Sequence, residues 1–459
     1  MPTELTLWYE FAERKSLTPR GGFGPTLDIV RTTDATYFDD SGILRIAVPG
    51  EARFGHIPST GESLGLLVED PGTNLLFQSE DLSTTWTNVG STETINDTTS
   101  PDGTNSADKL VEDSNTSDHL IRQVTDANLI AFNGYTVSVF VQAAERGFAF
   151  LTVSGDAFVL TGISINLSTG AVSTAVGLPL KATSLDLGNG WYRVSFDRLT
   201  AAALTAQIDI YASIDGIWAN RSYAGDGSSG IFVWGAQLEL RVFASSYIPT
   251  TTVAVTRNAD VVTTTDMSWL DVTQGTLAVA HRPLDPMSIQ GNDYLVDITN
   301  TTVHAITIVR ATGITASARW FEGTLQAQLD RSASFSSGVE SIVASAWQTN
   351  DFDAYVDGDQ MGTPDVSGTV PITLNKLSIG SAENSTQQMN GYIRDFRYYN
   401  IRQPTNLLIE LSLGTLAGAR VTPSNRRARG QAQAMWAQRM RSNQVDGDII
   451  TAIWEYLNG

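Results

Sequence analysis

The stretch Tyr135–Gln142, YTVSVFVQ, decides the fold class, because apolar residues at 135, 137, 139 and 141 recur at every second position. A period of two predicts a β-strand with one buried face. The same alternation returns over residues 163–168, 192–197 and 204–210, and turn sequences rich in glycine separate these runs. Several strands at this spacing predict an antiparallel β-sandwich, which we place at residues 73–255.

Composition narrows the classes of function. The chain has 459 residues, a formal net charge of -20 and no cysteine. The length predicts two or three domains. The acidic balance argues against a nucleic-acid partner, which needs a basic surface. The absence of cysteine excludes disulfides, Cys-zinc sites and thiol nucleophiles. No run of 18 apolar residues exists, so no membrane insertion is expected, and the first 15 residues do not resemble a signal peptide.

Residues Arg31–Trp86 carry two spaced motifs, R-x-x-x-ATYFD-x-x-G-x-L and GLLVE-x-x-x-TNLL. Turn residues at 39–42 and 70–72 divide the segment into short hairpins, which must lie on a larger body. The segment resembles one that recurs in structural proteins of tailed bacteriophages and gene transfer agents, where it precedes displayed β-sandwich domains. The resemblance implies a location on the virion surface, synthesis in the host cytoplasm, and other virion proteins as partners. It also implies a homo-oligomer, for which we favour a trimer.

Phrases in residues 73–255 add a second resemblance. NLLFQSEDLSTTW, GNGWYRVSF, VWGAQLEL and YIPTTTVAVTRNADV occur in this order and resemble the jelly-roll, carbohydrate-binding-like domain of phage fibres and spikes. That domain often carries a structural calcium. By resemblance the matching ligands are Glu80 and Glu239, and no other cofactor is expected.

A new set of strands begins near residue 272 and ends near 402, after a linker-like stretch at 261–271. DFDAYVDGDQMG and GYIRDFRYYN resemble laminin-G/concanavalin-type lectin sandwiches. The expected fold is therefore mainly β, with a jelly-roll, then a concanavalin-like sandwich, then a short helical region. Residues 1–72 are expected to form a hairpin segment of their own ahead of both.

The best candidate for a glycan contact is the loop at 217–223, because a sugar ring stacks on an aromatic side chain while its hydroxyls bind polar ones. We assign the contact to four residues of this loop: Trp218, Asn220, Arg221 and Tyr223. Acidic residues at 351, 353, 357 and 359 offer a second candidate, a carboxylate pair or a cation site, against the plainer reading of a solvated hairpin.

The last residues, 403–459, are expected to form short helices with apolar stripes. Met435 and Trp436 lie on one stripe, and Ile453 and Trp454 on another. Short helices are marginal alone, so the stripes predict assembly or docking. The alternative is a cap folded on the chain's own second sandwich.

These observations predict a phage fibre, spike or decoration protein that binds host cell-surface glycans. The histidines show no metal-binding spacing and no nucleophile elbow is present, so an enzyme is not expected. A polysaccharide depolymerase on the same scaffold and a purely structural virion connector remain the alternatives.

Overall fold

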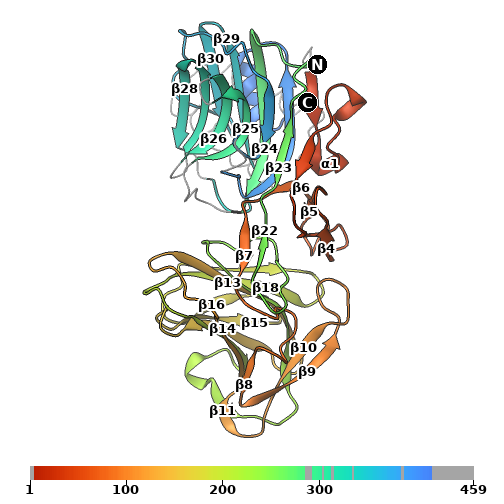
Figure 1. Ribbon diagram of the computed structural model, residues 1–459, viewed down its shortest axis with the longest axis vertical. Coiled ribbons are helices and arrows are strands. Elements are labelled where there is room, and N and C mark those ends of the chain that lie inside the picture. The colour runs from red at the N-terminus through yellow and green to blue at the C-terminus, as the bar shows by residue number, and fades with distance from the viewer. Residues whose placement is uncertain are drawn as a thin grey trace, which may run out of the picture.

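Two antiparallel β-sandwiches stand end to end in the computed structural model, joined at a narrow waist (Figure 1). The structure describes residues 5–284, 292–301, 304–311, 315–332, 335–383 and 387–415. The mainly β fold expected from the alternation of side chains is confirmed. No helix in these ranges has the length and apolar character needed to cross a bilayer.

The lower lobe in Figure 1 is the jelly-roll. Its two six-stranded sheets pack face to face, and a two-stranded ribbon of β11 (Thr116–Asp118) and β20 (Ser222–Ala224) lies beside them. The sheet nearer the waist has the order β17 (Lys181–Asp186), β18 (Trp191–Leu199), β13 (Gly134–Ala143), β21 (Gly230–Glu239), β10 (Ala107–Glu112) and β9 (Ser91–Thr98). The distal sheet has the order β16 (Val172–Val176), β15 (Thr161–Asn166), β14 (Phe148–Ser154), β19 (Gln207–Ser213), β12 (Leu120–Val124) and β8 (Thr87–Val89).

The core of this lobe is built from side chains at every second position of the facing strands. Val137, Val139 and Val141 of β13 point inward and are buried against Ile208 and Ile210 of β19 in one hydrophobic cluster. The side chains between them on β19 point to the other side of the distal sheet, which faces away from the core.

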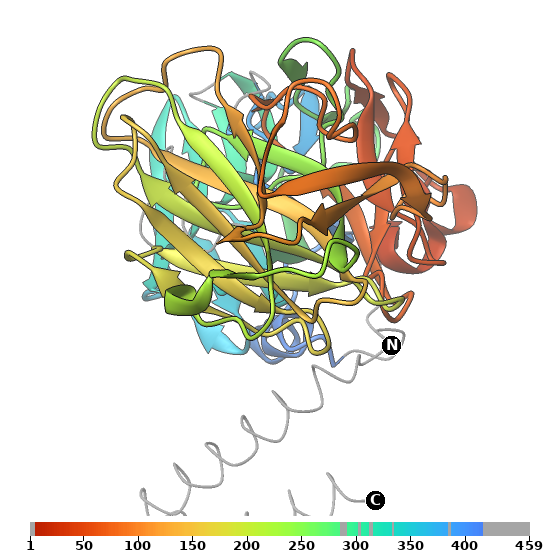
Figure 2. The ribbon, with the colours of Figure 1, turned by 90° about the horizontal axis from the view of Figure 1, so that it is seen from below.

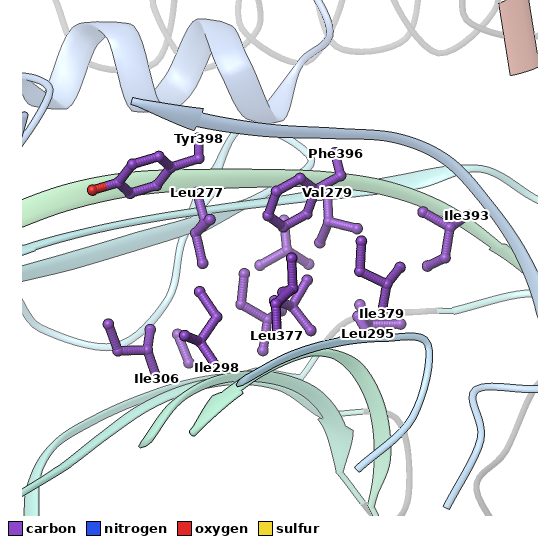
Figure 3. Close-up of a cluster of buried hydrophobic side chains, with 14 of the residues drawn as sticks. Leu277, Val279, Leu295, Ile298, Ile306, Leu377, Ile379, Ile393, Phe396 and Tyr398 are labelled. Atoms are coloured by element: carbon purple, nitrogen blue, oxygen red, sulfur yellow. The ribbon is translucent and has the colours of Figure 1, made fainter. Parts of the chain in front are cut away.

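The upper lobe is the concanavalin-like sandwich. Its eight-stranded sheet has the order β31 (Asp359–Gln360), β30 (Asp351–Val356), β29 (Ser341–Gln348), β24 (Gln274–Pro283), β33 (Gly391–Tyr399), β6 (Ser63–Val68) and β5 (Phe54–His56), with β1 (Leu5–Tyr9) also paired to β33. Its seven-stranded sheet has the order β2 (Asp28–Val30), β23 (Val261–Thr264), β32 (Lys376–Ile379), β25 (Asp293–Thr301), β26 (His304–Ala311), β27 (Thr315–Glu322) and β28 (Thr324–Ser332). Figure 3 shows Leu277 and Phe396 of the first sheet facing Ile298, Ile306 and Leu377 of the second.

The N-terminal segment is built into the upper lobe. β1 and β6 pair with β33, more than 300 residues away, through Leu5↔Tyr399 and Leu66↔Ile393. The short helix α1 (Phe11–Arg14) and the 3₁₀ turn η1 (Arg20–Gly22) connect β1 to β2. Sequence analysis treats residues 1–72 as a unit ahead of both sandwiches and residues 261–271 as a linker. The structure instead uses β1, β2, β5 and β6 as strands of the second sandwich and makes β23 a strand beside β2.

The jelly-roll is therefore inserted into the concanavalin-like sandwich. The chain enters it through β7 (Gly72–Asn74) and leaves it through β22 (Val255–Arg257), and these two strands pair with each other. The entry and exit points are adjacent, so the remainder of the sandwich closes around the insertion without a break in its sheets.

A buried group of ions holds the waist. The Asp260 carboxylate accepts hydrogen bonds from Arg31 Nη1 at 2.8 Å and from Arg53 Nη2. Arg53 also pairs with Glu69 at 2.7 Å, and the guanidinium of Arg257 lies 3.7 Å from the same carboxylate. All five side chains are fully buried. Burial opposes ionisation of Glu69, but Arg257 and Arg53 lower its pKa below the ordinary value. Arg31 and Glu69, which belong to the two spaced motifs of residues 31–86, thus lie at the junction of the lobes.

The short helix α2 (Thr405–Ser412) lies at the start of residues 403–459, which are expected to be helical. It packs through Leu408 and Leu411 onto the outer side of the eight-stranded sheet, against Ala344 and Tyr399. The stripes of Met435, Trp436, Ile453 and Trp454 lie outside the described residues.

Candidate functional site on the distal face of the jelly-roll

The outer side of the distal sheet carries aromatic and polar side chains in rows. Strand register places Leu120, Tyr211 and Phe150 side by side on β12, β19 and β14. The next row, two residues along each strand, is Arg122, Asp209 and Thr152. This face points away from the upper lobe: Figure 2, viewed from below, shows the yellow strands of the distal sheet toward the viewer.

The polar row is held in one arrangement by its own hydrogen bonds. Arg122 donates to both oxygens of the Asp209 carboxylate, from Nε at 2.7 Å and from Nη2 at 2.9 Å. Gln207 donates to Asp209 at 3.0 Å and to the Ser154 hydroxyl at 3.1 Å. The hydrogen bond with Asp209 raises the pKa of Arg122 above its usual value, so this side chain stays charged.

Asp209 is buried, whereas the Arg122 side chain is 32% exposed and Gln207 is half-buried. A bidentate guanidinium–carboxylate pair is geometrically specific, so the Arg122 head group is held beside Asp209 on the outer side of the sheet. The row therefore offers fixed donors to a ligand without first having to order its side chains.

The predicted loop lies over the aromatic row. Trp218 begins the 3₁₀ turn η2 (Trp218–Asn220), which appears in Figure 2 as a short green coil in front of the sheet. The Trp218 ring packs edge-to-face on Phe150 at 5.3 Å and on Tyr211 at 5.5 Å between ring centroids. The Arg221 guanidinium lies 4.8 Å from the Trp218 centroid and pairs with Asp118 at 3.2 Å. Trp218 is half-buried, and the Tyr211 ring on which it packs is two residues along β19 from Asp209 of the polar row.

Two of the four residues predicted to contact a glycan, Tyr223 and Asn220, bind other residues of the protein instead. Tyr223 is buried on β20, and its hydroxyl donates to Glu112 at 2.7 Å on the other side of the loop. Asn220 is exposed, but its amide donates to Asp215 at 2.7 Å within the turn. Of the four, Trp218 packs directly on the distal sheet, and Arg221 packs on the Trp218 ring.

Four residues of this face, Arg122, Asp209, Gln207 and Tyr211, were not predicted from the sequence. The signal was present, because the strand over residues 204–210 shows Gln207 and Asp209 on its polar side. Polar residues on the outer side of a strand are usually solvated. Only the register with β12 shows that Asp209 meets an arginine there.

The proposed calcium ligands have separate partners. The Tyr247 hydroxyl donates to Glu80 at 3.1 Å. Glu239 accepts from Ser245 at 2.6 Å and pairs with Arg241 at 3.1 Å. Across the described ranges, no group of three or more His, Cys, Asp or Glu side chains could hold a metal ion. The residues present do not fit the calcium site that the resemblance implies.

Two carboxylates of the acidic hairpin in the upper lobe, Asp351 and Asp353, share Arg402, and the other two have separate partners. Asp351 pairs with Arg402 at 2.7 Å, and Asp359 pairs with Arg331 at 2.7 Å. Asp357 accepts from the Ser341 hydroxyl at 2.7 Å. The carboxylates therefore act as local structural groups rather than as one site.

A buried carboxyl on the seven-stranded sheet has an unusual proton affinity. Burial raises the pKa of Asp297 to about 7, although the backbone N–H of Glu383 donates to it at 2.8 Å. The charge of Glu383 raises this pKa further and that of Lys376 lowers it. Asp297 therefore holds a proton in the folded protein at pH values where an exposed aspartate has lost it.

This shift predicts a pH-dependent stability. Between about pH 4 and pH 7 the folded state keeps a proton that the unfolded state releases, so stability from this group falls by up to about 1.4 kcal/mol per pH unit. We expect Asp297→Asn to gain stability over the wild type as pH rises across this window, in urea titrations at several pH values. Asp330→Asn, an exposed carboxyl on the same sheet, is the control. A difference between Asp297→Asn and wild type that is constant with pH would contradict the raised pKa.

Comparison with solved structures finds partial likenesses. One is the CBM40 domain of the Ruminococcus gnavus IT-sialidase bound to α2,6 sialyllactose, at 12% identity over 31% of this chain and 84% of that chain, with a TM-score of 0.27. Another is domain 4 of AbnA, a GH43 arabinanase from Geobacillus stearothermophilus in complex with arabinotriose, at 14% identity over 37% and 80%, with a TM-score of 0.29. A SAP-like pentraxin from Limulus polyphemus matches at 11% identity over 32% and 72%, with a TM-score of 0.24. Likenesses this partial say nothing about the ligand of this chain.

A search of curated proteins found no match. A family model does match part of the upper lobe. Residues 258–403 match the model described as the concanavalin A-like lectin/glucanases superfamily. That range covers the later strands of the upper sandwich, from β23 to β33, and leaves out β1, β2, β5 and β6. The upper lobe is thus a concanavalin-like sandwich completed by the N-terminal segment.

Proposed function

We propose that this chain is a virion surface protein that attaches a phage to glycans of its host, and that the distal face of the jelly-roll is the contact. The observation that carries the proposal is the fixed row of Arg122, Asp209 and Gln207 beside the half-buried indole of Trp218. This pairing of planar polar groups with an aromatic surface is what a sugar ring requires, since the ring has hydroxyls at its rim and C–H groups on its faces.

The position of the face supports attachment. It lies at the end of the molecule away from the upper lobe (Figures 1 and 2). A face at the far end of an anchored protein is free to meet a surface. One weak site per chain is sufficient, because many copies on a particle raise the effective concentration of sites.

The phage-like motif supports the virion role. Its residues hold the waist rather than the distal face. We infer that the residues of this motif join an inserted domain to the rest of the chain. The side chains on the distal face of the inserted domain would then determine which ligand binds.

One observation favours the alternative of a polysaccharide depolymerase. Asp297 lies in the sandwich matched by a lectin and glucanase family, and its pKa of about 7 suits a general acid near neutral pH. Glycoside hydrolysis also needs a second carboxyl at a defined distance. The candidate for this second carboxyl is Glu383, whose backbone N–H donates to Asp297 at 2.8 Å.

A glycan array and a reducing-sugar release assay on the same purified protein test these readings. We expect the protein to bind a subset of surface glycans and to release no reducing ends. Release of reducing ends that stops in Asp297→Asn would support the depolymerase. Absence of both binding and release would leave the structural connector and overturn the proposal.

We also propose that residues 424–459 assemble the protein into trimers or dock it on the particle, because the stripes of Met435, Trp436, Ile453 and Trp454 need a cover. Deleting residues 424–459 is expected to reduce the mass in solution from an oligomer to a single chain, measured by light scattering, while circular dichroism of both sandwiches is kept. Unchanged mass together with normal incorporation into particles would contradict this role and favour a cap on the chain's own sandwich.

A further inference from the structure

A cavity of about 210 Å³ lies between the hairpin of β3 (Ala35–Phe38) and β4 (Leu44–Ala47) and the jelly-roll. The hairpin supplies Arg45 and Ile46 to its wall, and the jelly-roll supplies Glu80, Asp102, Trp234 and Tyr247. In Figure 1 the hairpin, labelled at β4, lies beside the waist, on the side of β9 and β10. This volume is below the roughly 300–1,000 Å³ of pockets that enclose drug-sized ligands, so the cavity has room for one small group.

The cavity is a built feature, because the hairpin is fixed against the inserted lobe at several points. The Thr36 hydroxyl donates to the backbone carbonyl of Tyr247 at 2.5 Å, and the Leu44 N–H donates to that of Pro101 at 2.9 Å. The two walls therefore belong to segments that the fold holds together.

The charges in the cavity do not balance. The guanidinium of Arg45 is already paired with Asp39 at 2.6 Å. The two carboxyls of the opposite wall, Glu80 and Asp102, have no cation as a hydrogen-bond partner among the described residues. Glu80 accepts only from the Tyr247 hydroxyl at 3.1 Å, and Asp102 accepts from Ser100 and Thr104. Burial raises the pKa of Glu80, and the charge of Asp102 raises it further.

The remaining wall is aromatic and apolar. Trp234 and Tyr247 lie with their ring centroids 4.9 Å apart, and Ile46 stands 59% exposed at the rim. Trp234 and Tyr247 are themselves buried and also pack on Phe140, so they act here as an apolar wall. Carboxylates accept hydrogen bonds from ammonium groups. A positive donor group would relieve the repulsion between Glu80 and Asp102.

We propose that this cavity binds a primary ammonium group carried on a small body with an apolar face. Such a group occurs on amino sugars of cell-surface polymers and on amine side chains or polyamines. The ammonium would lie between the carboxyls of Glu80 and Asp102, and the body would rest on the aromatic and apolar wall. The inference does not depend on the distal face, since no residue is shared between them.

Calorimetric titration of the full chain at pH 7.5 tests the proposal with glucosamine, glucose, N-acetylglucosamine and cadaverine as probes. Glucosamine or cadaverine is expected to bind at least tenfold more tightly than glucose and N-acetylglucosamine, which lack the ammonium. Tighter binding of glucosamine identifies an amino sugar as the source, and tighter binding of cadaverine identifies an unmodified amine.

Variants locate the binding. Glu80→Gln and Asp102→Asn should each weaken amine binding at least tenfold, whereas Asp97→Asn, which removes one exposed charge from β9, should not. Asp102→Asn decides the result if Glu80→Gln fails to fold. Trp218→Ala should keep amine binding, so failure at the distal face and failure here are distinguishable. Equal binding of amines and neutral sugars, or amine binding that survives Asp102→Asn, would overturn the proposal.

Discussion

The Asp260→Ala variant is expected to lose about 3–5 kcal/mol of unfolding free energy, the cost of removing one partner from a buried ion pair. Asp260 binds both Arg31 and Arg53, and all three side chains are fully buried. Without the carboxylate, the buried Arg31 keeps only backbone carbonyls as acceptors. Arg53 is left to share the single charge of Glu69 with Arg257. A buried charge without a partner is strongly unfavourable.

Urea denaturation followed by circular dichroism measures this loss. Asp359→Ala is the matched control, because Asp359 pairs with Arg331 on the surface at side-chain exposures of 54% and 39%. Exposed pairs contribute about 0–1 kcal/mol. If the two variants lose similar amounts of unfolding free energy, the buried ion group does not stabilise the junction of the lobes.

The Leu66→Ala variant is expected to destabilise the upper lobe by about 2–5 kcal/mol, as for other large-to-small changes in a core. Leu66 lies in β6, is fully buried, and pairs with Ile393 of β33. If residues 1–72 are strands of the concanavalin-like sandwich, a cavity at Leu66 must weaken strands encoded more than 300 residues later.

Hydrogen exchange with mass spectrometry reads this effect strand by strand. Peptides from β33 and β24 should exchange faster in Leu66→Ala, and peptides from β13 and β18 of the jelly-roll should keep their protection. Val48→Ala, at an exposed site in the same segment, should change neither set. Unchanged protection of β33 in Leu66→Ala would mean that the N-terminal segment is not part of that sandwich.

Local patterns predicted the elements of this protein well. The strand over residues 135–142 and its neighbours follow from alternation, because the side-chain period of a strand is fixed by the backbone. The helix at 405–412 follows from Pro404 and the apolar residues after it. Each of these features depends on residues close together in the chain.

The insertion could not be predicted in this way. β1, β2, β5 and β6 are short strands, and nothing within residues 5–68 shows that their partners lie beyond residue 260. The two halves of the buried ion group are likewise separated by the whole jelly-roll, with Arg31 and Glu69 before it and Asp260 after it. These side chains can form ion pairs only after β7 and β22, the entry and exit strands, have paired.

The candidate site was predicted in part for the same reason. An aromatic and basic loop near a turn is the sequence signal for Trp218 and Arg221, and their contact with a glycan stays a prediction. Arg122 and Asp209, in the next row of the same sheet face, lie 87 positions apart and meet only through the β12–β19 register. Tyr223 was misplaced because it points to Glu112 instead of toward the sheet face.

Binding of the full chain to the glycan selected on an array tests the central claim most directly, through two matched pairs of variants. Arg122→Gln is compared with Arg331→Gln, an arginine in a surface ion pair of the other lobe. Trp218→Ala is compared with Trp8→Ala, a half-buried tryptophan of the other lobe that also lies under an arginine. We predict that the dissociation constant rises at least tenfold, about 1.4 kcal/mol, for Arg122→Gln and for Trp218→Ala and is unchanged for their controls. Equal affinity in all four folded variants would contradict the assignment of glycan binding to the distal face.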